Sequence, residues 1–145
     1  QLLPERAIDG PEIQVVLLGD RVLGAMQVER GAAAPDPLAP CQMMCPPQLS
    51  TACLHGIQNL ARRAVETLGL HDGLSRVDIL LSPRGNEIIL EVEPLPPLHR
   101  DGVVARVALA AGYRHEDLVH QLLQRMSMGA TAGPRPYAPA PLVLQ

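Results

Sequence analysis

Two aliphatic runs on either side of a short polar turn constrain this chain more than any other feature of its sequence. Residues 75–82 and 87–93 are rich in Ile, Leu and Val with charged side chains at intervals, and the turn at 83–86 contains Pro and Gly. This pattern predicts two antiparallel strands joined as a hairpin. A four-residue turn sets Ser82 opposite Glu87 and thereby fixes which side chains share a face along the hairpin.

The register predicted in this way gathers the charged side chains of the hairpin on one face. Asp78 falls opposite Glu91 and Arg76 opposite Glu93, and directly opposed residues point to the same side of a sheet. The other face is expected to be apolar. On that face Val77, Ile79 and Leu81 are expected to oppose Val92, Leu90 and Ile88.

The acids of this hairpin raise the question of a bound cation. Carboxylates that oppose each other at about 5 Å between Cβ atoms repel unless a positive charge lies between them. Carboxylate oxygens from adjacent strands, completed by water and phosphate, are ligands that Mg²⁺ accepts. Asp78 and Glu91 therefore suit a metal site. Their spacing alone is also compatible with a solvated face on which Arg76 neutralises one acid and water screens the rest.

Another hairpin and a long loop precede this one in the sequence. Residues 12–18 and 21–28 are rich in β-formers and flank a Gly-Asp dipeptide that suits a tight turn. Residues 31–47 are nearly uncharged, and five prolines fall between 35 and 47. Because proline excludes a regular helix or a central strand, we expect a long loop there.

Three helices are predicted by apolar residues that recur at intervals of three and four. Ser50 is placed to cap the first of them, and Gly69 is placed to end it. Two shorter helices are expected at residues 102–111 and 116–126. Together with the strands they predict the α+β class, with a mainly antiparallel sheet and packed helices.

Length and charge bound the number of domains and the kinds of partner. The 145 residues suit one domain, which we place at residues 1–126, followed at 127–145 by a tail or linker rich in Gly, Ala and Pro. A net charge of −3 provides no basic field for nucleic acid. No apolar run approaches the roughly 20 residues that span a membrane. We therefore expect a cytoplasmic protein that binds neither nucleic acid nor membrane.

Four stretches of the chain carry a family resemblance. They lie at residues 5–12, 45–49, 76–94 and 104–123. The first contains Gly-Pro-Glu, the second is Cys-Pro-Pro-Gln-Leu, the third contains Arg-Val-Asp and Leu-Glu-Val-Glu-Pro, and the last an Ala-Gly step followed by Asp-Leu-Val. In this order and spacing they resemble the carboxy-terminal part of the D-alanine–D-alanine ligase family within the ATP-grasp superfamily. The resemblance covers roughly residues 3–126.

The resemblance implies an ATP-dependent carboxylate–amine ligase that acts through an acyl phosphate. ATP and Mg²⁺ would be the cofactors, and small amino-acid-like carboxylates and amines the substrates. An amino-terminal part of the same fold would be missing from this chain, and the protein would form a homodimer as many relatives do.

The resemblance also assigns four residues to the nucleoside of ATP. Glu5, with the backbone of Ala7 and Ile8, would contact adenine, and Glu12 would hold the ribose hydroxyls. Glu5 and Glu12 flank a turn, and the alternative is that both are simply solvated surface acids.

Four further residues are assigned to the phosphates by the same resemblance. Asp78, Glu91 and Glu93 would bind Mg²⁺ ions that bridge the ATP phosphates. Arg76 would stabilise the transferring phosphoryl group and the oxyanion of the tetrahedral intermediate. The simpler alternative makes Arg76 only the ion-pair partner of Glu93.

Several residues depart from the family pattern. Glu93 stands where the family has Asn, and residues 94–97 replace a Pro-Gly step. The loop at 31–47 lacks the Tyr and the phosphate-contacting Lys of the family, and the chain contains no Lys at all. These departures keep open a catalytically degenerate ATP-grasp module used for binding or regulation. An unrelated α+β domain with a solvated acidic face is the third interpretation.

Overall fold

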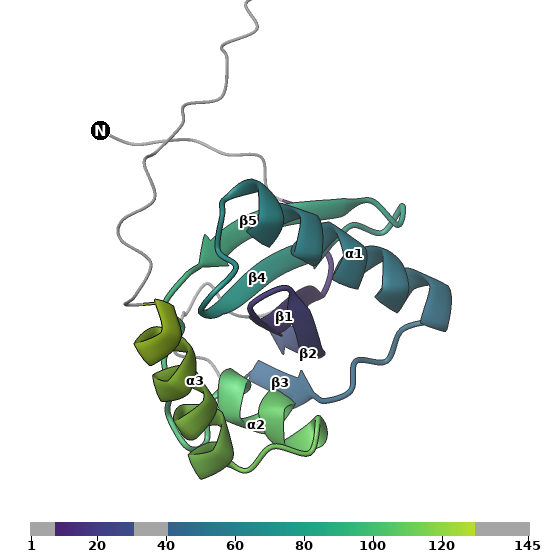
Figure 1. Ribbon diagram of the computed structural model, residues 1–145. Coiled ribbons are helices and arrows are strands. Elements are labelled where there is room, and N and C mark those ends of the chain that lie inside the picture. Colours follow the sequence, from purple (N-terminus) through teal and green to yellow (C-terminus); the bar gives the residue numbers. More distant parts are fainter. Residues whose placement is uncertain (1–7, 31–40, 130–145) are drawn as a thin grey trace, which may run out of the picture.

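The computed structural model describes residues 8–30 and 41–129, which form a single sheet flanked by helices (Figure 1). All neighbouring strands are antiparallel, in the order β3-β2-β1-β4-β5. The strands are β1 (Glu12–Leu18), β2 (Arg21–Arg30), β3 (Cys41–Met44), β4 (Leu74–Leu81) and β5 (Glu87–Glu93). The helices are α1 (Thr51–Thr67), α2 (Val103–Ala110) and α3 (His115–Gly129). The expected α+β architecture is confirmed.

The β1–β2 hairpin forms where the sequence predicts it. Its turn contains Gly19, whose φ of +63° lies in the left-handed region that glycine adopts without strain. The pairing shifts register between Val16 and Leu17, which marks a bulge or irregularity in β1. This strand occupies the centre of the sheet, so its side chains lie between those of β2 and β4 on both faces.

The β4–β5 hairpin keeps only half of its predicted register. Glu87 pairs with Leu81 rather than Ser82, and Ile79 pairs with Ile89 rather than Leu90. A register shift next to Asp78 then restores the predicted pairing for the remainder of the hairpin. The bulge accommodates one extra residue in β5, a common device for re-aiming side chains near a sheet edge. The predicted apolar pairs near the turn are therefore wrong, whereas the charged pairs are right.

The predicted long loop contains a short strand. Residues 41–44 form β3, which pairs with β2 at the edge of the sheet, and residues 31–40 lie outside the described part of the chain. Pro46 lies two residues beyond the end of this strand and does not interrupt it. An edge position suits such a segment because β3 needs partners on one side only.

The helices begin and end close to their predicted positions. Ser50 caps α1, its Oγ accepting a hydrogen bond from the Cys53 backbone N–H at 3.2 Å, and Gly69 follows the helix with a φ of +71°. Helix α3 continues to Gly129, three residues beyond the expected end at Met126. None of the helices in the described ranges is both long and apolar enough to cross a membrane.

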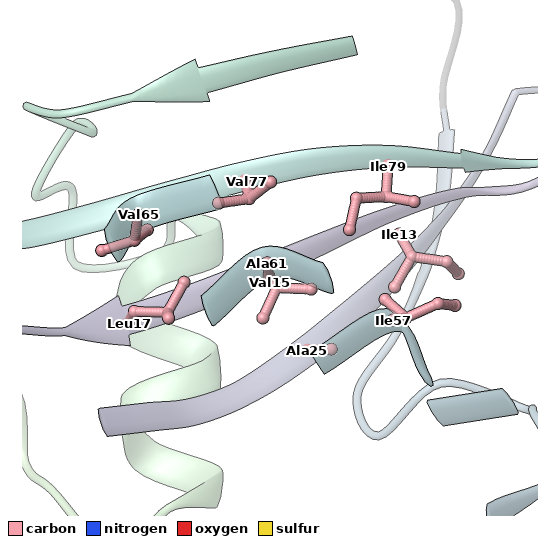
Figure 2. Close-up of a cluster of buried hydrophobic side chains, with 9 residues drawn as sticks. All are labelled: Ile13, Val15, Leu17, Ala25, Ile57, Ala61, Val65, Val77 and Ile79. Atoms are coloured by element: carbon pink, nitrogen blue, oxygen red, sulfur yellow. The ribbon is translucent and has the colours of Figure 1, made fainter. Parts of the chain in front are cut away.

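The sheet separates two hydrophobic clusters because neighbouring residues of a strand point to opposite faces. On the α1 face, helix α1 contributes three buried residues and the strands the rest, as Figure 2 shows. This cluster consists of Ile13, Val15, Leu17, Ala25, Ile57, Ala61, Val65, Val77 and Ile79. Helices α2 and α3 cover part of the other face. That cluster consists of Val16, Met26, Val28, Leu74, Val104, Val107, Ala108 and Leu118.

Candidate functional site

Charged and polar side chains occupy the part of the second face that lies beside the α2–α3 cluster. Gln14 lies two residues from Val16 on β1, so both point to this face, and Gln14 pairs with Asp78 on β4. Asp78 in turn pairs with Glu91, and Arg76 with Glu93. We refer to this set as the polar row; its members are Glu12, Gln14, Arg76, Asp78, Glu91 and Glu93.

Arg76 forms a two-pronged ion pair with Asp78. Its Nε donates to Asp78 Oδ1 at 2.7 Å and its Nη2 to Asp78 Oδ2 at 2.9 Å. The two residues are two positions apart on one strand and therefore share a face. Both side chains are largely buried, with exposed fractions of 18% for Arg76 and 8% for Asp78. The ion pair thus runs along β4, whereas the alternative drawn from the sequence placed it across the hairpin, between Arg76 and Glu93.

Burial has the largest effect on the protonation of Asp78. Burial raises the pKa of its carboxyl group, and the nearby carboxylates of Glu12 and Glu91 act in the same direction, although Arg76 opposes them. The pKa of Arg76 is raised, chiefly by its hydrogen bond to Asp78. The guanidinium therefore stays charged, while the acids around Asp78 still repel one another.

Glu91 and Glu93 differ in their exposure to solvent and in their hydrogen bonding. Glu91 is exposed, while Glu93 is half-buried and its Oε1 accepts a hydrogen bond from the Leu95 backbone N–H at 3.1 Å. Asp78 and Glu91 fit a hard divalent cation, since they offer carboxylate oxygens from adjacent strands. In the described part of the chain, no three His, Cys, Asp or Glu side chains converge into a ready-made metal site. The three-acid set stays a prediction.

The residues assigned to the nucleoside lie at the start of β1 or before it. Glu5 and Ala7 fall outside the described residues, and Ile8 is half-buried. The segment after Ile8 is tied to the end of β4, because the Leu81 N–H donates to the Pro11 carbonyl oxygen at 3.0 Å. A Cβ added at Gly10 would lie 2.0 Å from the Leu81 carbonyl oxygen. Gly10 therefore permits the close approach of this segment to the end of β4.

Gln14 is a member of the polar row that sequence reasoning missed. Its Nε2 donates to Glu12 Oε1 at 2.5 Å, so it contacts the residue assigned to the ribose. The available signal was a lone amide inside the otherwise apolar run at 13–18. Its place beside Asp78 depends on the pairing of β1 with β4, strands that are distant in the sequence.

A family model agrees with the resemblance drawn from the sequence. The model described as the D-ala D-ala ligase C-terminus matches residues 1–124. The D-alanine–D-alanine ligase of Actinobacillus succinogenes is 30% identical over 128 residues, which cover 85% of this chain and 41% of that enzyme. The corresponding ligase of Gloeobacter violaceus is 34% identical over 131 residues, covering 86% and 43%.

Solved structures share the fold at lower sequence identity. The D-alanine–D-alanine ligase of Bacillus anthracis, solved with ATP, superposes with a TM-score of 0.75 at 18% identity, covering 89% of this chain and 42% of that one. The VanG D-Ala:D-Ser ligase of Enterococcus faecalis gives a TM-score of 0.71 at 20% identity, covering 82% and 37%.

These matches agree on which portion of a ligase is present. The chain spans about two fifths of the length of the curated relatives it matches. The family model covers most of the chain, including the whole polar row. This chain therefore belongs to the D-alanine–D-alanine ligase family and corresponds to its carboxy-terminal domain.

Proposed function

We propose that this chain supplies the carboxy-terminal half of the site of an ATP-dependent carboxylate–amine ligase similar to D-alanine–D-alanine ligase. The observation that carries this proposal is the cross-strand pair of Asp78 and Glu91, with Arg76 bound to Asp78 on the same face. The chemistry would proceed by transfer of a phosphoryl group to a carboxylate, followed by attack of an amine on the acyl phosphate. Amino-acid-like acids and amines are the proposed substrates.

Asp78 and Glu91 are the side chains that would hold Mg²⁺, and Glu93 is the weaker candidate. Bound Mg²⁺ neutralises charge on the phosphates of ATP. The repulsion among Asp78, Glu12 and Glu91 supports this assignment, because a cation would relieve it. Oε1 of Glu93 already accepts a hydrogen bond from the Leu95 N–H, which leaves Oε2 as the oxygen that would reach the metal.

Arg76 would stabilise the negative charge of the transferring group. A guanidinium offers several donors in a fixed planar arrangement that suits phosphate oxygens. Asp78 engages Nε and Nη2, so Nη1 is the nitrogen that we assign to the phosphate. The ion pair fixes the orientation of the guanidinium before substrate arrives, which is the condition for electrostatic catalysis.

The remaining assignments complete the nucleotide site. Glu5 and the backbone of Ala7 and Ile8 would contact adenine, and Glu12 would bind the ribose hydroxyls. The hydrogen bond from Gln14 supports the role of Glu12, because it orients that carboxylate. The other half of the site would come from an amino-terminal part of the same fold, and the assembled protein is proposed to be a homodimer.

Nucleotide binding is the first test, made on the full protein that carries this chain. We expect a non-hydrolysable ATP analogue to raise the melting temperature only when Mg²⁺ is present. Asp78→Asn and Glu91→Gln should each abolish the shift, while Glu66→Gln should retain it, since Glu66 is an exposed acid on α1. A shift that survives both site substitutions would show that the polar row does not bind the nucleotide.

Turnover is the second test. Phosphate release from ATP should require both a carboxylic acid and an amine, which distinguishes a ligase from a simple ATPase. A catalytically degenerate binding module is favoured by one observation, the lack of Lys and Tyr in residues 31–47. That alternative predicts Mg²⁺-dependent nucleotide binding without phosphate release across a panel of amino acids.

A further inference from the structure

Two buried glutamines lie on neighbouring strands of the sheet and differ in how their amides are satisfied. Gln27 on β2 is 5% exposed; its Oε1 accepts from the Gln48 N–H at 2.9 Å and its Nε2 donates to Glu29 at 2.7 Å. Gln14 on β1 is 8% exposed. Its Nε2 donates to Glu12, but its Oε1 is buried and has no hydrogen-bond partner among the described residues.

The chemistry of the contact with Glu12 fixes the orientation of the Gln14 amide. A carboxylate only accepts hydrogen bonds, so the NH₂ group must face Glu12 and the oxygen must face elsewhere. A buried acceptor without a donor costs free energy, and native proteins leave few such groups. A bound molecule would therefore supply the hydrogen-bond donor that the described residues do not offer to the Gln14 oxygen.

The position of this oxygen associates it with the polar row. Gln14 pairs with Asp78, so its side chain is on the face that carries Asp78, Arg76 and Glu91. Gln27 pairs with Ile13 and so points to the α1 face. Gln27, whose amide oxygen and nitrogen both form hydrogen bonds, thus lies on the α1 face. Gln14, whose oxygen has no partner among the described residues, lies on the face of the proposed nucleotide site.

We propose that Gln14 is a ligand-binding residue of this site: its Nε2 holds Glu12 in position, and its Oε1 accepts a hydrogen bond from an O–H group of the bound ligand. The inference rests on the proposed function. An amide oxygen can only accept hydrogen bonds, so its partner must be a donor. A nucleotide complex offers O–H donors from two sources, the ribose hydroxyls and water bound to the cation.

The test compares Gln14→Met with Gln27→Met in the full protein. Both substitutions replace a buried amide by an apolar side chain of similar length, but only the first removes a group from the polar row. We expect Gln14→Met to weaken Mg²⁺–ATP binding about tenfold in calorimetry, as one lost hydrogen bond implies. We expect the affinity of Gln27→Met to stay within twofold of the unsubstituted protein.

Gln14→Glu tests the contact with Glu12 and provides a second variant if Gln14→Met does not fold. It keeps an acceptor but loses the donor to Glu12 and places two carboxylates together. It should therefore weaken Mg²⁺–ATP binding by at least tenfold.

Deoxynucleotides and Mg²⁺ titrations identify the donor. If a ribose hydroxyl bonds to Gln14, the penalty of Gln14→Met will shrink with 2′-deoxy-ATP or 3′-deoxy-ATP. If cation-bound water is the donor, the penalty will persist with both analogues and more Mg²⁺ will be needed for half-saturation. Either result supports the proposal.

Two results would overturn it, and they are distinguishable. If the unsubstituted protein binds Mg²⁺–ATP and folded Gln14 variants bind it as tightly as Gln27→Met does, the role of Gln14 is wrong while the proposed function stands. If the unsubstituted protein does not bind Mg²⁺–ATP at all, both the proposed function and the role of Gln14 are wrong.

Discussion

The two faces of the sheet use the same strands for opposite purposes. Val15 and Val77 pair across β1 and β4 and are buried beneath α1. Their sequence neighbours Gln14 and Asp78 pair with each other on the opposite face. The α1 face is apolar and covered along the central strands (Figure 2). The second face is covered by α2 and α3 over only part of its area, and the polar row lies beside them. The alternation of side chains along β1 and β4 thus places the buried residues beneath α1 on one face and the residues proposed to bind the nucleotide on the other.

The largest effect that would test this division is a truncation beneath α1. Ile57→Ala should lower the free energy of unfolding by about 2–5 kcal/mol, because Ile57 is fully buried and its truncation leaves a cavity. Leu68→Ala is the matched control just beyond the same helix, since Leu68 is 58% exposed. Its effect should stay within about 0.5 kcal/mol. Equal losses for the two variants in urea unfolding would contradict the assignment of the core.

A smaller and pH-dependent effect is expected at Asp78. Its pKa is raised in the folded protein, mainly by burial, so the folded state binds this proton more tightly than the unfolded state does. The contribution of Asp78 to stability therefore falls as the pH rises from about 3.9, the usual Asp value, through its folded pKa. Above that pKa the penalty is constant.

Asp78→Asn removes this titration and keeps an acceptor for Arg76. The stability of the Asn variant relative to the unsubstituted protein should therefore increase across this pH range and then level off. Urea unfolding at a series of pH values measures the difference. A difference that shrinks as the pH rises would mean that Arg76 stabilises the ionised carboxylate more than burial destabilises it.

The smallest effect on folding is expected at Glu91. Because this side chain is exposed, Glu91→Gln should change the free energy of unfolding by no more than about 0.5 kcal/mol. The same substitution should remove the Mg²⁺-dependent stabilisation by nucleotide. These two results together would assign Glu91 to ligand binding and not to folding. A large loss of stability without ligand would instead make Glu91 a structural residue.

How much could be predicted from the sequence depended on how local each interaction is. The pairs Asp78–Glu91 and Arg76–Glu93 belong to one hairpin, and the sequence predicted them correctly because the extra residue in β5 offsets a one-residue error in the predicted turn pairing. The sequence did not predict the bulge beside Asp78. A strand with one extra residue still alternates on either side of it, so the sequence pattern does not show where the register shifts. The predicted turn pairing was therefore wrong although the charged pairs were right.

The sequence patterns did not predict interactions between segments that are distant in the sequence. The place of Gln14 in the polar row depends on β1 pairing with β4, and nothing local specifies that neighbour. The orientation of Arg76 along its own strand, toward Asp78, depends likewise on side-chain packing. The edge strand β3 was missed because nearby prolines indicated a loop, whereas an edge strand between prolines needs only one partner.

The most direct measurement is a crystal structure of the full protein with Mg²⁺ and a non-hydrolysable ATP analogue. We predict that the phosphates will lie over the polar row, with a cation about 2.1 Å from a carboxylate oxygen of Asp78 or Glu91. A nucleotide bound elsewhere, with these two carboxylates in contact only with solvent and Arg76, would contradict the central claim.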